Sequence, residues 1–118
     1  MEAISAHATR VMDTVIDTTT ARLNDDAAMA KFLAAIPNGE ELGKVLAGTG
    51  PVSTRAYDDA TQTARFVESD GGTVMCFTVT DITIDQAEMI TAEWEGISAL
   101  NETEFQKAVE RALGWSET

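Results

Sequence analysis

Basic side chains are scarce in this sequence, and the stretch between Arg65 and Lys107 contains no lysine, arginine or histidine. The whole chain has eight lysines and arginines against twenty aspartates and glutamates, which gives a formal net charge of −12. Because contacts to phosphate need lysine and arginine, we expect no direct binding of nucleic acid. Binding to anionic membrane surfaces is disfavoured for the same reason.

Cysteine and histidine occur once each, and their scarcity narrows the possible chemistry. A single cysteine, Cys76, excludes an internal disulfide and a cysteine-based zinc site. Cys76 lies among apolar residues, so we interpret it as a small buried hydrophobe rather than a nucleophile. His7 has no partner visible in the sequence, and we expect it to be a surface residue. We therefore expect a protein with no catalytic residues.

Patterns that would hold a cofactor or a metal ion are also missing. The glycines match neither the dinucleotide-binding pattern nor the Walker pattern, so no cofactor is expected. Asp81, Thr83 and Asp85 alternate like the first ligands of a calcium loop. Gln86 and Ala92, however, stand where that loop needs glycine and a bidentate glutamate. No metal site is expected.

No apolar run approaches the roughly 18 residues of a membrane span, and the first residues do not resemble a secretory signal. We therefore expect a soluble protein located in the cytoplasm or in a virion. With 118 residues, 44% of them hydrophobic, the chain has the size and composition of one globular domain, which we place at 1–118.

The first 50 residues are predicted to be helical. Apolar residues recur at three- and four-residue spacing from Ile4 to Leu23, which predicts one long helix with a single apolar stripe. Asn24 resembles a helix cap before a short, deeply buried helix that ends near Ile36. A third helix is expected over residues 40–47, with its apolar side chains inward: Leu42, Val45 and Leu46.

Residues 51–84 change to a period of two, which predicts β-strands. The segment Ser69-Asp70-Gly71-Gly72 is typical of a hairpin between two such strands. The last run, residues 73–80, has apolar residues on both faces, which indicates a central strand covered on both sides. The segment as a whole predicts a three-stranded antiparallel meander.

Residues 85–118 return to helical spacing. Thr83 and Gln86 have the spacing of a capping box before a helix whose buried face carries Ala87, Ile90, Trp94 and Ile97. A last helix follows Asn101, with apolar residues at Phe105, Ala108, Val109, Ala112 and Leu113. The predicted fold class is thus α+β: N-terminal helices, a three-stranded meander, and two C-terminal helices packed on the sheet.

The acidity is concentrated in the second half of the chain. Residues 1–57 contain seven acids and five bases, whereas residues 58–118 contain thirteen acids and three bases. An uncompensated negative field of this kind selects basic partners. We therefore expect a non-catalytic module that docks on a basic protein surface, such as an inhibitor, an anti-defence protein or a regulator, with mimicry of nucleic acid as its strongest form. The expected contact residues are Asp81, Asp85, Glu88, Glu95, Glu102 and Trp115.

The sequence also fits three alternatives to this docking role. The acidic residues can form an ordinary solvated face, or reflect a GC-rich or salt-adapted source. The chain can instead be a structural subunit of a virion or a homo-oligomer with apolar contacts. It can also be a small enzyme whose site has no recognisable motif. Trp115 is either a clasp that packs back on the last helix or an exposed anchor.

Overall fold

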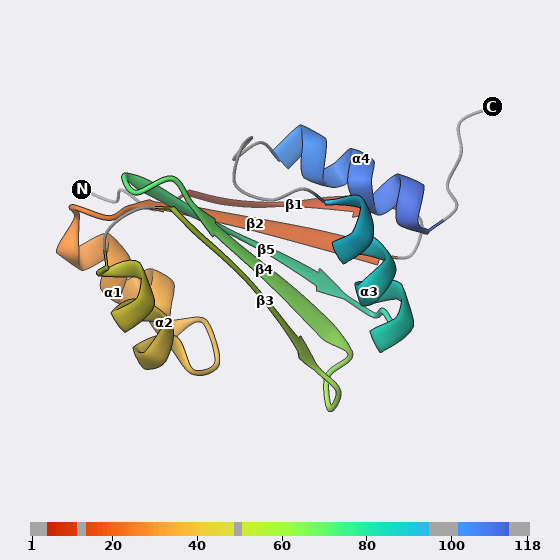
Figure 1. Ribbon diagram of the computed structural model, residues 1–118, viewed down its shortest axis with the longest axis horizontal. Coiled ribbons are helices and arrows are strands. Elements are labelled where there is room, and N and C mark those ends of the chain that lie inside the picture. Colours follow the sequence, from red (N-terminus) through yellow and green to blue (C-terminus); the bar gives the residue numbers. More distant parts are fainter. Residues whose placement is uncertain (1–4, 12–13, 49–50, 95–101, 114–118) are drawn as a thin grey trace.

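A five-stranded antiparallel sheet forms the centre of the protein. The computed structural model describes residues 5–11, 14–48, 51–94 and 102–113, with the backbone alone for residues 5–11, 14 and 15. In chain order the elements are β1 (Ser5–Val11), β2 (Thr14–Arg22), α1 (Asp26–Ala34), α2 (Gly39–Leu46), β3 (Val52–Asp58), β4 (Thr63–Ser69), β5 (Thr73–Thr80), α3 (Ile84–Glu93) and α4 (Glu102–Ala112). The strand order is β1-β2-β5-β4-β3 (Figure 1). The predicted α+β class is confirmed, but the prediction of a three-stranded sheet is wrong, because the sheet has five strands.

The predicted long N-terminal helix is instead an antiparallel pair of strands. β2 pairs with β1 on one side and with β5 on the other, so that Ile16 lies opposite Val79 and Thr18 opposite Phe77. Six of the nine residues of β2 are β-branched, and such side chains lose rotamer freedom in a helix but pack well on a pleated sheet. The strand preference of this threonine-rich run overrides the helical spacing of its apolar residues.

β5 lies inside the sheet, between β2 and β4, and is buried on both faces. Val74 and Cys76 belong to a core cluster shared with α1 and α2, whereas Phe77 and Val79 belong to a second cluster shared with α3 and α4. Adjacent residues of a strand point to opposite faces, so the two helix pairs cover opposite sides of the sheet. This confirms the prediction of a central strand covered on both sides.

The two helices after β2 form nearly where the sequence predicts them. The cap of α1 is Asp25, one residue later than expected, and its side chain accepts a hydrogen bond from the Ala28 amide at 3.0 Å. α1 buries only Ala28 and Phe32, because it covers one part of a sheet face rather than a complete core. Val45 of α2, expected to point inward, is 52% exposed.

The two C-terminal helices confirm the pattern read from the sequence. α3 starts with the complete capping box of Thr83 and Gln86, and it buries Ala87 and Ile90 before Trp94. The apolar face of α4 is buried at Phe105, Ala108, Val109 and Ala112. Phe105 stacks on Phe77 with a centroid distance of 4.3 Å, which fixes α4 on the sheet. Ile97, Asn101 and Trp115 lie outside the described residues.

Candidate functional site

The segment just before α3 is held in place by two hydrogen bonds to the Ile82 backbone and by burial of the Ile82 side chain. The Ile82 amide donates a hydrogen bond to the Gln62 carbonyl at 3.2 Å, and the Ile82 side chain is buried. The Tyr57 hydroxyl donates to the Ile82 carbonyl at 2.7 Å. Asp81 has a φ of 60°, a left-handed conformation that aspartate tolerates better than most residues. The chain therefore leaves β5 and enters α3 in one fixed direction.

The outer face of α3 combines charged and apolar side chains. Asp85 and Glu88 are exposed, and Ile84 and Met89 are 45% and 49% exposed. Residues four apart lie side by side on a helix, so Ile84 neighbours Glu88, and Asp85 neighbours Met89. Asp81 is exposed just before this helix. We call these five residues (Asp81, Ile84, Asp85, Glu88 and Met89) the α3 face.

The three carboxylates of the α3 face form no ion pair with the described part of the chain. In the part of the chain that the structure describes, no lysine or arginine lies within ion-pair distance of Asp81, Asp85 or Glu88. Glu93 on the same helix differs, because the Arg111 guanidinium donates to its carboxylate at 2.8 Å. Arg55 lines a small pocket together with Ile84 and Glu88, but its guanidinium donates to the Trp94 carbonyl at 3.3 Å. The negative potential of this face is therefore only partly compensated at short range.

Two more carboxylates lie at the β3–β4 turn, which the Tyr57 hydrogen bond joins to the start of α3. They are Asp58 and Asp59. Partial burial raises the pKa of the Tyr57 phenol, and the charges of Asp59 and Asp58 raise that pKa further. The charges of this turn thus act on the phenol that is hydrogen-bonded to the segment before α3.

The other expected contact residues are placed differently. Glu102 is half-buried at the start of α4 and interacts with other residues. Glu95 and Trp115 lie outside the described residues. The structure therefore brings together Asp81, Asp85 and Glu88, three of the six residues expected from the sequence, and adds Ile84 and Met89, which sequence reasoning missed.

A second feature missed from the sequence is the burial of Glu68, whose side chain on β4 is 0% exposed. Its Oε2 atom accepts hydrogen bonds from the Trp94 indole and the Ser53 hydroxyl, both at 3.0 Å. Its Oε1 atom has no hydrogen-bond partner among the residues that the structure describes. Glu68 continues the alternation of Ala64 and Phe66 along one face of the strand, and this pattern in the sequence could have predicted its burial. We interpret this carboxyl group as an acceptor that fixes Trp94 in the core.

Cys76 is buried at 3% exposure, and burial raises the pKa of its thiol, although the Thr78 hydroxyl and the Arg65 charge act in the opposite direction. A raised pKa lowers the thiolate fraction and with it the reactivity. His7 falls in β1, where the side chain is not described. Among the described residues, no three histidine, cysteine or acidic side chains are grouped closely enough to hold a metal ion.

The chain matches no protein-family model, no curated protein and no solved structure. Within the described ranges, none of the helices has both the length and the hydropathy that crossing a membrane requires.

Proposed function

We propose that this protein is a non-catalytic binding module whose α3 face docks on a basic surface of a partner protein. The observation that carries the proposal is the combination, on one short segment, of two exposed apolar side chains and three exposed carboxylates that form no ion pair with the described residues. Inhibition, interference with a defence system, or regulation are the roles that such docking would serve, and a nucleic-acid-binding surface of a partner is the kind of target it fits.

The two kinds of side chain have different effects on binding. Ile84 and Met89 supply apolar area on either side of Asp85 and Glu88, and burial of such a side chain against a partner is worth about 1.5–3 kcal/mol when it is complete. Exposed charge pairs contribute less, typically about 0.2–1 kcal/mol each, and mainly speed association and suppress wrong partners. The apolar pair therefore sets affinity, and the carboxylates set partner choice and salt dependence.

The dipole of α3 stabilises one of the three carboxylates. Asp85 lies in the first turn of α3, where the positive end of the helix dipole stabilises a negative charge by about 0.3–1 kcal/mol. Glu88 lies a turn further on, and Asp81 precedes the helix, so neither gains this stabilisation in full. The repulsion within the set is thus only partly offset inside the protein, and a basic partner would remove the rest.

The experiment compares two double variants with the same change in net charge. Asp85→Asn with Glu88→Gln alters the α3 face, whereas Asp26→Asn with Glu40→Gln alters exposed acids in the first turns of α1 and α2. The probe is a synthetic helical peptide with lysines on one face and leucines on the other, and its affinity is measured by titration calorimetry at 50 and 200 mM salt.

We expect the α3 variant to bind about fivefold more weakly at low salt and to show a smaller salt dependence, as the loss of two exposed charge pairs implies. The control variant should stay within about twofold of the original protein. A third variant, Ile84→Ala with Met89→Ala, should bind at least about tenfold more weakly with an unchanged salt dependence. Equal weakening by both charge variants would contradict the proposal, because it would show a general attraction to an acidic protein.

A further inference from the structure

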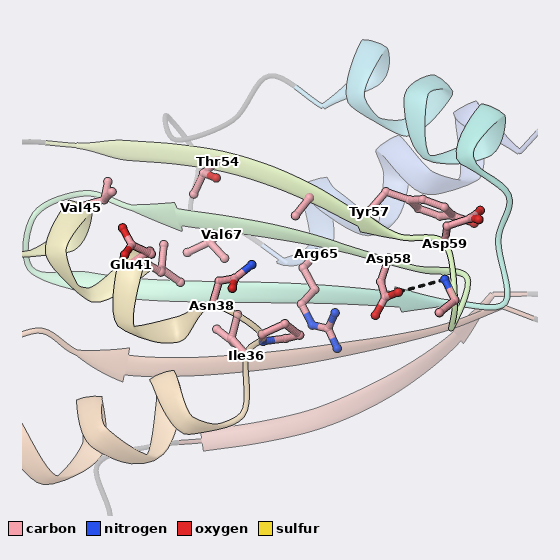
Figure 2. Close-up of a pocket in the computed structure, with 14 residues that line it drawn as sticks. Ile36, Asn38, Glu41, Val45, Thr54, Tyr57, Asp58, Asp59, Arg65 and Val67 are labelled. Atoms are coloured by element: carbon pink, nitrogen blue, oxygen red, sulfur yellow. Dashed lines mark hydrogen bonds between the residues drawn. The ribbon is translucent and has the colours of Figure 1, made fainter.

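A pocket of about 630 Å³ opens on the sheet face that carries α1 and α2 (Figure 2). Its floor comes from β3 and β4, its wall from α2 and the turn before it, and one end from the β3–β4 turn. This volume lies in the range of about 300–1,000 Å³ that is usual for small-molecule sites. The pocket belongs to a different face of the sheet from the α3 face.

The wall of the pocket and the part of its floor next to it are apolar. The wall contains Ile36 and Pro37 from the turn and Leu42 and Val45 from α2, and the floor contains Val67 from β4. Val45 is 52% exposed, so the pocket leaves apolar surface in contact with water. An apolar group placed against these side chains would remove that surface from water, which is favourable by about 25 cal/mol per Å².

The guanidinium of Arg65 lies in the middle of the same pocket, beyond the apolar wall (Figure 2). Arg65 is half-buried, and among the described residues no carboxylate lies within ion-pair distance of it. Guanidinium groups bind carboxylates through two parallel hydrogen bonds, and such pairs are among the stronger contacts in proteins. In a chain of net charge −12, a half-buried arginine without a carboxylate partner in the described ranges is a position for a ligand anion.

Carboxylates also line the pocket. Asp58 lies beside Arg65, and one of its oxygens accepts the Ala60 amide at 3.0 Å, whereas Asp59 lies next to Tyr57 (Figure 2). Glu41, a residue of α2, lies at the end of the pocket opposite to the β3–β4 turn. A purely anionic ligand would be attracted by one cation but repelled by three acids. A purely cationic ligand would meet Arg65.

We propose that this pocket binds a small zwitterion with an apolar body, of the class of amino acids with branched or aromatic side chains. The ligand carboxylate pairs with Arg65, the ammonium group faces Asp58, and the apolar side chain lies against Leu42 and Val67. Both signs of charge are then compensated without a net charge entering an acidic protein. This role is independent of docking by the α3 face.

The test uses three small molecules that share one apolar body. L-leucine carries both charges, 4-methylpentanoate lacks the ammonium group, and 3-methylbutylamine lacks the carboxylate. Each is titrated into the ¹⁵N-labelled protein, and dissociation constants are taken from amide chemical shifts. L-leucine should bind at least about tenfold more tightly than either analogue, with the largest shifts in the turn before α2 and in β4.

Variants assign the contacts. Arg65→Gln should weaken binding of L-leucine at least about tenfold and leave that of 3-methylbutylamine unchanged or tighter, because only the carboxylate loses its partner. Arg22→Gln removes an exposed arginine outside the pocket and should leave both affinities unchanged. If Arg65→Gln does not fold, Arg65→Lys keeps the charge without the two-pronged geometry and should show an intermediate loss.

Two results would overturn the proposal. One is the absence of saturable binding of L-leucine up to 10 mM, on the order of the weakest affinity of interest, which would leave Arg65 as a structural counter-charge. The other is binding of 4-methylpentanoate or 3-methylbutylamine as tightly as L-leucine, because one charged group of the ligand would then contribute nothing.

Discussion

Replacing Trp94 by phenylalanine tests the buried contact between the sheet and α3. The variant keeps an aromatic ring near Phe77 and Phe105, whose centroids lie 5.7 and 5.1 Å from the Trp94 ring, but it removes the donor to Glu68. Glu68 then keeps one donor, the Ser53 hydroxyl, for a side chain that is fully buried. Loss of one such hydrogen bond costs about 1–3 kcal/mol. The smaller ring leaves a void that adds about 1–2 kcal/mol.

The expected loss of unfolding free energy for Trp94→Phe is therefore about 2–5 kcal/mol. The two contributions are separated by repeating the substitution in a Glu68→Met background, where no carboxyl group is left without a donor. There, Trp94→Phe should cost only the packing share of about 1–2 kcal/mol. The original protein, the two single variants and the double variant form a double-mutant cycle. Their free energies of unfolding are measured by urea unfolding followed by circular dichroism, because two of the four proteins lack the fluorescence of Trp94.

The coupling between the two sites should reach about 1–3 kcal/mol. A coupling below about 0.5 kcal/mol, which is the usual deviation from additivity for independent sites, would refute the assigned role of the Glu68 carboxyl group. If Trp94→Phe does not fold, Ser53→Ala is used instead, because it removes the other hydrogen-bond donor to Glu68 without leaving a core cavity. It should lower the free energy of unfolding by about 1 kcal/mol in the original protein and leave it unchanged in the Glu68→Met background.

Two further predictions concern turns and glycines. A Cβ atom added at Gly39 would lie 2.0 Å from the Leu33 carbonyl oxygen, whereas at Gly43 it would meet only the flexible end of the Leu33 side chain at 2.9 Å. Gly39→Ala should therefore lower the urea midpoint clearly, and Gly43→Ala should leave it unchanged or raise it by the helix preference of alanine, about 0.5–1 kcal/mol; the opposite order would contradict the placement of α2. The backbone amides of Thr73 and Gly72 lower the pKa of the Asp70 carboxyl group, so its stabilising contribution is complete above the unfolded value of about 3.9 and is lost as the pH falls through the lower folded value. The difference in melting temperature between the original protein and Asp70→Asn should thus shrink between pH 5 and pH 2.5, and a constant difference would contradict this.

The position of β5 shows how far the sequence could predict this fold. A third strand at the end of a three-stranded meander has one free edge, yet residues 73–80 carry apolar side chains on both faces. Burial on both faces is typical of a strand inside a sheet, which pairs with another strand along each edge. The second neighbour of β5 is β2, with Ile16 opposite Val79. The run from Thr18 to Thr20 is poor for a helix, but local spacing alone indicates no partner strand for it, and the long-range pairing decides its conformation.

The α3 face and the pocket also differ in how far the sequence could predict them. The capping box at Thr83 fixes where α3 begins, and the spacing of the buried residues Ala87 and Ile90 fixes its inward face. The exposure of Asp85 and Glu88 therefore follows from local pattern. The exposure of Ile84 and Met89 follows from the same periodicity and could have been predicted. The pocket could not, because it needs Arg65 beside the turn before α2, a contact between segments far apart in sequence that depends on how α1 and α2 pack on the sheet.

A chemical-shift map of the original protein with the lysine–leucine peptide tests the central claim most directly. At 50 mM salt, the amides of residues 81–89 should shift most and saturate together, and these shifts should fall as the salt concentration rises. Shifts spread evenly over α1, α2 and α4, or confined to them, would contradict docking by the α3 face.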